Sequence, residues 1–278
     1  MIQFNENSFR NRKHVFCWFG FAFQAGAINA GGFLACHSFV SHVTGIGTQI
    51  GIQLGLGEIL AAIELLSVPF SFLAGAVVSA LLIDRRQLLH KPPKYLTALV
   101  IISVLLGTAL ILGYYGLFGA FGEPFERGRD VILVSLLCAA CGLQNASMVS
   151  ATRGQIRTTH LTGTLTDFGV ALIRVKYLRR FSKEKYRQVL VNRIRLGTLL
   201  FFSTGSALSS VICAKYEYMG FALPFLTSLL LLAVSYTMNS KRMIQDPRSL
   251  KSIFTRTRTE LVQSRAAQPK PVKMETEN

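Results

Sequence analysis

Two stretches of this chain carry one unusual pattern of histidine, threonine and glycine. They read SHVTGIGTQIG at residues 41–51 and THLTGTLTDFG at residues 159–169. The two align without a gap, and each places a Thr-Gly pair two residues after its histidine. Such a polar string is unusual inside an apolar sequence, so its recurrence indicates an internal duplication.

Two further matches lie on either side of this pattern, in the same order. Before it, GAINA at residues 26–30 matches GLQNA at residues 142–146. After it, a Phe, Gly and Ser in residues 72–79 match the same residue types in residues 202–209. The ordered matches divide the chain into two related halves, residues 15–118 and 131–237.

The composition indicates a membrane protein. Half of the 278 residues are apolar and 16% are charged, yet 30 Lys and Arg against 14 Asp and Glu give a net charge of +16. Because the mean hydropathy is +0.39, the charges must be segregated from the apolar mass. A disordered chain is excluded, and five cysteines are too few for a disulfide-rich secreted module. A soluble nucleic-acid binder is also disfavoured.

Six apolar runs bounded by charge predict transmembrane helices, because about 20 residues span about 30 Å of hydrocarbon. They are residues 15–35, 60–83, 96–118, 131–150, 196–214 and 221–237. The runs do not alternate with period two, so we predict an all-α polytopic protein and not a barrel. Two more polar segments, residues 39–57 and 158–173, are apolar enough to enter the bilayer.

The distribution of Lys and Arg favours six spans with both termini in the cytoplasm. If the two polar segments are broken or re-entrant, the basic loop 84–94 lies inside with most other basic residues. Each half then crosses three times, so the second half is inverted relative to the first. If both segments cross fully, the chain has eight spans and parallel repeats. Residues 1–14 are expected to be cytoplasmic, and the first run is too long for a cleaved signal peptide.

These motifs resemble a known family. The HVTG string at residues 42–45, CGLQNA at 141–146 and RTTHLTGTLTDFG at 157–169 are similar to the YoaK-like family of bacterial integral membrane proteins (domain of unknown function 1275). The resemblance covers residues 15 to about 237. It implies a multi-pass protein of the bacterial inner membrane and supplies no established reaction. Asn29 stands where the family commonly has Asp, and Ile46 where it commonly has Asn, which argues against a proton-linked role for the first motif.

The polar residues of the two halves are candidate solute ligands: Asn29, His42, Thr44, Thr48, Asn145, His160, Thr162, Thr166 and Asp167. Burying a carboxylate such as Asp167 at a helix centre costs roughly 2.5 to 3.5 kcal/mol on insertion scales, so it needs a partner or a function. On a helix, Thr162 and Thr166 share one face, beside Asp167. These groups could coordinate a small cation or hydrogen-bond a polar solute. The alternative is a structural ion pair between Asp167 and a nearby arginine.

The histidines and asparagines have structural interpretations beside the functional ones. A neutral imidazole at His42 or His160 could relay protons or bind metal, but we favour a cap that hydrogen-bonds the backbone of its polar segment. Asn29 and Asn145 lie late in a span, where an amide can pair with freed backbone groups or join helices.

Lipids and an unidentified solute are the expected partners. Residues 174–195 predict an amphipathic cytoplasmic helix on anionic lipid headgroups, and residues 238–278 a basic, partly disordered cytoplasmic tail. Neither segment requires a nucleic acid. We predict no cofactor, no metal and no catalytic residue. The Cys pair at residues 138 and 141 does not indicate zinc, because it lacks a four-ligand set. Gly-rich faces are compatible with a homo-oligomer.

Three functions fit this sequence. A secondary transporter of a small polar or ionic solute ranks first, because of the duplication and the polar segments within apolar surroundings. A non-catalytic membrane scaffold or accessory protein acting through the basic segments ranks second. A membrane-embedded enzyme using His160 and Asp167 ranks third, since no nucleophile, metal cluster or phosphate-binding loop is recognisable.

Overall fold

The computed structural model describes residues 12–123, 128–152, 154, 156–179 and 182–245. Residues 1–235 form one compact unit. The second unit is residues 236–278, of which residues 236–245 are described as the end of a helix. The described part of the chain is helical and contains no strand. The expectations for residues 1–11 and for the tail beyond residue 245 lie outside the described residues.

Each of the six predicted apolar runs lies mostly in helix, and the third, residues 96–118, extends four residues beyond the end of its helix. The helices are α1 (Arg12–Cys36), α2 (Val43–Gly55), α3 (Ile59–Leu65), α4 (Ser67–Leu82), α5 (Asp84–Leu88), α6 (Tyr95–Tyr114), α7 (Arg129–Thr152), α8 (Leu161–Tyr177), α9 (Lys183–Tyr216), the 3-10 helix η2 (Glu217–Phe221) and α10 (Ala222–Gln245). The second run is divided between α3 and α4 at Leu66. Pro69 explains this break, because it has no N–H to bond the carbonyl of Leu65.

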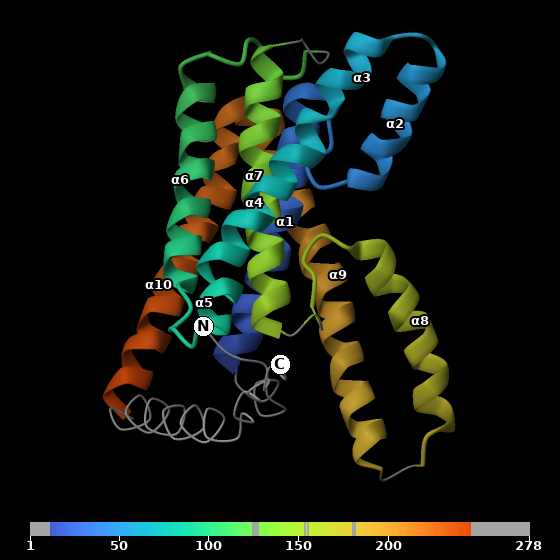
Figure 1. Cartoon of the computed structure of the whole chain (residues 1–278), viewed down its shortest axis with the longest axis vertical. Coiled ribbons are helices and arrows are strands. Elements are labelled where there is room, and N and C mark those ends of the chain that lie inside the picture. Colours follow the sequence, from blue (N-terminus) through green and yellow to red (C-terminus); the bar gives the residue numbers. More distant parts are fainter. Residues whose placement is uncertain (1–11, 124–127, 153, 155, 180–181, 246–278) are drawn as a thin grey trace, which may run out of the picture. The chain divides into compact units, whose positions relative to one another are not determined.

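Five described stretches are long and apolar enough to cross a membrane. They are Lys13–Cys36, Ile59–Leu88, Tyr95–Tyr114, Arg129–Thr152 and Lys183–Met238. The last has 56 residues and contains α9, η2 and the first part of α10. In Figure 1, α1, α6 and α9 run in one direction, and α4, α7 and α10 up to Ser235 run in the other.

Each half contributes one helix to each of two close helix crossings. At the contact of α1 with α9, a Cβ added to Gly26 would clash with the carbonyl oxygen of Phe202, and one added to Gly205 with that of Phe23. At the contact of α4 with α7, Gly75 and Gly142 meet the facing backbone in the same way. The matched glycines of the repeat therefore allow backbone-to-backbone approach between the halves.

The matched serines add hydrogen bonds at the same crossings. Ser209 Oγ donates to the carbonyl of Ala27 at 2.9 Å. Ser79 Oγ lies 2.9 Å from Ser147 Oγ, and both residues are buried. In an apolar surrounding these hydroxyls hold facing helices together.

The two polar segments form short helices at opposite ends of this unit. α2 lies against α3 and α8 against α9, each after a non-helical return from the preceding long helix (Figure 1). The expectation of one surface helix over residues 174–195 is wrong. Residues 174–177 end α8, and residues 183–195 belong to α9, which continues without a break into the apolar run 196–214. No Pro interrupts residues 183–214, and Gly197 at the junction is tolerated inside the helix.

Candidate functional site

Both asparagines of the repeat hold the chain where it turns back from a long helix. Asn29 Oδ1 accepts hydrogen bonds from the backbone N–H of Ser41 at 3.2 Å and from its hydroxyl at 3.1 Å. Asn145 Oδ1 accepts the N–H of Thr158 at 3.2 Å and its hydroxyl at 3.5 Å. These amides therefore satisfy backbone groups outside the helices, which is one of the two structural roles expected from the sequence; these bonds do not join one helix to another.

Gln144 strengthens the second turn and was missed by the sequence argument. Its Nε2 donates to Thr158 Oγ1 at 3.3 Å and to the carbonyl of Phe21 on α1 at 2.9 Å. The side chain is fully buried. It therefore ties the return after α7 to a helix of the other half.

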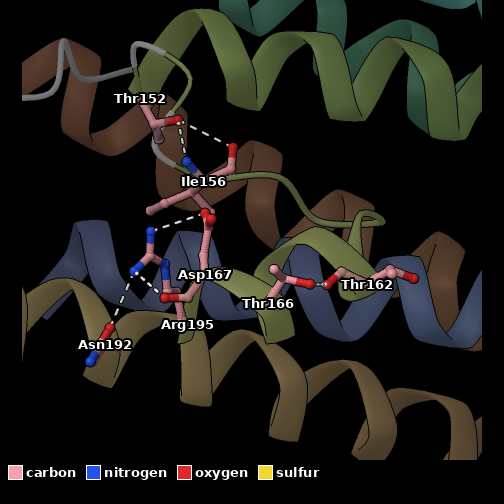
Figure 2. Close-up of polar contacts among 7 residues, drawn as sticks. All are labelled: Thr152, Ile156, Thr162, Thr166, Asp167, Asn192 and Arg195. Atoms are coloured by element: carbon pink, nitrogen blue, oxygen red, sulfur yellow. Dashed lines mark hydrogen bonds and ion pairs between the residues drawn. The ribbon is translucent and has the colours of Figure 1, made fainter. Parts of the chain in front are cut away.

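The return itself is closed by Thr152. Its hydroxyl accepts the N–H of Ile156 at 3.1 Å and donates to the carbonyl of Met148 at 2.7 Å. Figure 2 shows this bond beside Asp167 and Arg195. The bond turns the chain back just beyond the end of α7 and sets the position of Arg157.

The four threonines make local bonds along their own helices. Thr48 Oγ1 donates to the carbonyl of Thr44 at 3.2 Å, and Thr166 Oγ1 donates to that of Thr162 at 3.0 Å. All four residues are exposed. In Figure 2 the hydroxyl of Thr166 points along α8 toward Thr162, whereas Asp167 faces Arg195. The structure therefore does not bring these threonines together with Asp167 in one site.

The two histidines occupy the N-cap positions of α2 and α8. Neither imidazole makes a capping hydrogen bond. The expectation that each ring caps its helix is therefore wrong; the His42 ring lies over Gly45 in the first turn of α2 without bonding its amides. The His42 ring lies 5.8 Å from that of Phe39, and His160 accepts a hydrogen bond from Arg157.

Asp167 forms the arginine ion pair that the sequence left as one of two readings. Arg195 Nη2 lies 3.0 Å from Asp167 Oδ2, and its Nη1 donates to the Asp167 carbonyl at 3.3 Å and to Asn192 Oδ1 at 3.2 Å. The Asp167 side chain is 65% exposed and that of Arg195 is 19% exposed. The pair joins α8 to α9 (Figure 2), and its exposure leaves the carboxylate accessible.

A cavity of about 300 Å³ lies at this pair. Its polar lining comes from the return after α7, the first turns of α8, and α9: Arg157, His160, Thr164, Asp167, Arg195 and Thr198. A second cavity, of about 480 Å³, shares Arg157 and His160 with it and also contains Asp84 and Asn145. Arg157 and His160 therefore lie at the boundary between two polar cavities.

The imidazole of His160 is the acceptor that orients Arg157. Arg157 Nη1 donates to His160 Nδ1 at 3.4 Å, which requires an unprotonated Nδ1. His160 lies outside the membrane-spanning stretches, and burial together with the positive charge of Arg157 lowers its pKa below 6.5. The ring is therefore neutral at pH 7.

Of the nine predicted residues, His160 and Asp167 line the first cavity, and Asn145 and His160 the second. His42, Thr44, Thr48 and Asn29 belong to the other half. Arg157 and Arg195 were not predicted as site residues, although Arg157 lies two residues before the second motif. In the described residues, no group of three or more His, Cys, Asp or Glu could hold a metal ion.

Comparison with known proteins places the chain by family and not by activity. No curated protein and no solved structure matches it significantly. A family model described as a protein of unknown function (DUF1275) matches residues 17–236, which contain nearly all of both halves and the whole site. Together with the apolar helices, this match indicates a multi-pass membrane protein. The chain belongs to the DUF1275 family.

Proposed function

We propose that this protein is a secondary transporter of a small polar or ionic solute, with its central site at the cavity between α8 and α9. One observation carries the proposal: the polar return after α7 and the start of α8 enclose a charged cavity beside a long apolar helix. Transporters use irregular backbone of this kind where it lines a solute cavity.

The proposed topology has six crossings, with the second half inverted relative to the first. Two observations support it. α1 and α7, the first long helices of the two halves, run in opposite directions (Figure 1). Each half also contributes one helix to each of the two crossings at which the matched glycines meet the facing backbone. We propose that the protein crosses a bacterial inner membrane and that both of its termini lie on the cytoplasmic side.

Cysteine labelling in intact cells tests this topology. Leu88 is 80% exposed and Glu123 is also exposed, so single reporters there are accessible in the fold. The five native cysteines are buried and can be replaced first. Six spans predict labelling from outside at residue 123 and not at 88, and eight spans predict the reverse.

The charged pair occurs in one half. In the repeat alignment, Gln49 corresponds to Asp167, and Leu65 corresponds to Arg195. The first half therefore has no equivalent pair, and the proposed solute site is single. We therefore propose that the second motif, and not the first, forms the solute site.

Flux measurements test the proposed function. The protein reconstituted in vesicles containing a pH-sensitive dye is exposed to inorganic phosphate, organic acids, amino acids and alkali cations in turn. At least one solute should drive flux through the wild-type protein, and Asp167→Asn should lower that flux at least about tenfold. Glu184→Gln is the control, because Glu184 is an exposed carboxylate outside the cavity, and this variant should retain the flux. Equal flux in both variants would remove Asp167 from the site.

A scaffold function remains the second candidate because the α8 and α9 hairpin exposes basic side chains. Arg174, Lys176 and Arg187 are exposed there. If no solute moves, and charge reversal at these residues abolishes the cellular phenotype while cavity variants change only abundance, the scaffold is favoured over the transporter.

A further inference from the structure

The cavity between α8 and α9 has an excess of positive charge. Arg157 and Arg195 both line it, and Asp167 is the carboxylate in its lining. Asp167 compensates Arg195, whereas the hydrogen-bond partner found for Arg157 is the imidazole of His160, which is neutral at pH 7. One guanidinium charge is therefore left without a carboxylate in the cavity.

The first turn of α8 adds hydrogen-bond donors to the same cavity. The first intrahelical bond is from Thr164 N–H to the carbonyl of His160, so the amides before Thr164 have no acceptor within the helix. His160 does not cap them. Gly163 lines the cavity, and a Cβ added there would meet nothing within 4 Å. The N-terminus of this 17-residue helix is thus open toward the arginines.

We propose that this cavity binds a small oxyanion, a phosphate or a carboxylate, between Arg157, Arg195 and the first-turn amides of α8. Planar guanidinium groups bind such anions through paired hydrogen bonds, and a helix N-terminus presents free N–H groups and a positive dipole end. The cavity volume of about 300 Å³ suits a small molecule. That this anion is the transported solute rests on the proposed function.

Neighbouring basic residues extend the positive field outward. A further cavity of about 450 Å³ shares Asp167 and Arg195 and is also lined by Arg174 and Arg187. Positive side chains along an entrance raise the local concentration of anions. The anion would therefore approach along α8 and α9 and meet Arg195 before Arg157.

Asp167 has a defined role in this site. Its accessible carboxylate pairs with Arg195, so an anion entering the cavity must compete with it for that guanidinium. Removing the carboxylate should therefore tighten anion binding and slow release. A cation site predicts the opposite, because Asp167 would then be a ligand.

Binding of radiolabelled inorganic phosphate and succinate to the full chain in phosphatidylcholine nanodiscs tests the proposal without any flux. Arg157→Gln and Arg195→Gln should weaken binding about tenfold or more, since each removes charged hydrogen bonds. Lys176→Gln removes the same charge from α8 outside the cavities and should leave affinity unchanged. Asp167→Asn should tighten binding, by up to about fivefold.

The gain in the Asp167 variant cannot result from misfolding, so the proposal remains testable if an arginine variant is unstable. The proposal is overturned if neither probe binds saturably, if Arg157→Gln behaves like Lys176→Gln, or if Asp167→Asn weakens binding. Phosphate binding without flux would support the anion site and reject the transporter. Flux without anion binding would support the transporter and reject the anion site.

A lipid headgroup is the other source of the same chemistry. Nanodiscs containing phosphatidic acid distinguish the sources. If the headgroup enters the cavity, phosphatidic acid weakens the apparent affinity of the wild-type chain for free phosphate. If the ligand comes from solution, the affinity does not change. Both results support an oxyanion site and differ in the source of the anion.

Discussion

Arg195 of α9 donates two hydrogen bonds to Asp167 of α8, one to the Asp167 carboxylate at 3.0 Å and one to the Asp167 backbone carbonyl at 3.3 Å. The two residues are 28 positions apart and belong to the two helices that enclose the polar cavity. Because the carboxylate is 65% exposed, the ion pair is solvated and weak as a source of stability.

Asp167→Asn should therefore leave the fold intact. An exposed ion pair contributes about 0 to 1 kcal/mol, so we expect a small change in the unfolding midpoint in detergent micelles. Thermal unfolding monitored by circular dichroism measures it, with Glu184→Gln as the matched loss of a carboxylate. A large loss of stability would mean that Asp167 acts mainly in folding.

Gly26→Ala and Gly205→Ala should destabilise the crossing of α1 with α9. Each added methyl group would collide with a backbone carbonyl of the facing helix, which cannot rotate away. We expect a loss of about 1–3 kcal/mol or more. Gly47→Ala is the control, because a Cβ there meets nothing within 4 Å. Thermal unfolding measures the stability of the three variants. Equal unfolding midpoints for all three would contradict the close crossing of α1 with α9.

Asn145→Leu should loosen the return after α7. It removes the acceptor for the N–H of Thr158 and leaves that buried group unpaired, at about 1–3 kcal/mol. Hydrogen exchange of residues 156–160 should accelerate, and Arg157 and His160 should lose their fixed positions. The counterpart Asn29→Leu should affect residues 37–42 and leave 156–160 unchanged.

The imidazole of His160 should titrate below its ordinary pKa of 6.5, because burial and then Arg157 disfavour its charged form. The charged groups that line its two cavities are Asp84 of α5, Asp167 of α8, Arg195 of α9, and Arg157 itself. Arg157→Gln removes one of the two causes and should raise the pKa toward 6.5. Nuclear magnetic resonance of labelled histidine measures both values.

The sign of the linked stability follows from this lowered pKa. The unfolded chain binds the proton at a higher pH than the folded chain does, so His160 contributes stability above pH 6.5. That contribution falls as the pH drops from 6.5 toward the lowered pKa. His160→Gln should flatten this part of the stability profile, and a steeper profile would contradict the assignment.

The sequence by itself determined the helical membrane class, and it predicts the repeat and a structural role for Asn29 and Asn145. Run length and composition are properties of consecutive residues, so they can be read without a fold. The same local reasoning wrongly predicted one helix over residues 174–195, whereas residues 174–177 end α8 and residues 183–195 continue into the apolar run that follows.

Only the tertiary structure decided which helices cross and which charges meet. Gly26 faces Phe202 of the other half, and Arg195 reaches Asp167, because the chain turns back at Thr152 and again before Lys183. The same turn brings Arg157 to His160 and opens the cavity. Local patterns do not contain such contacts, because they depend on where successive helices pack against one another.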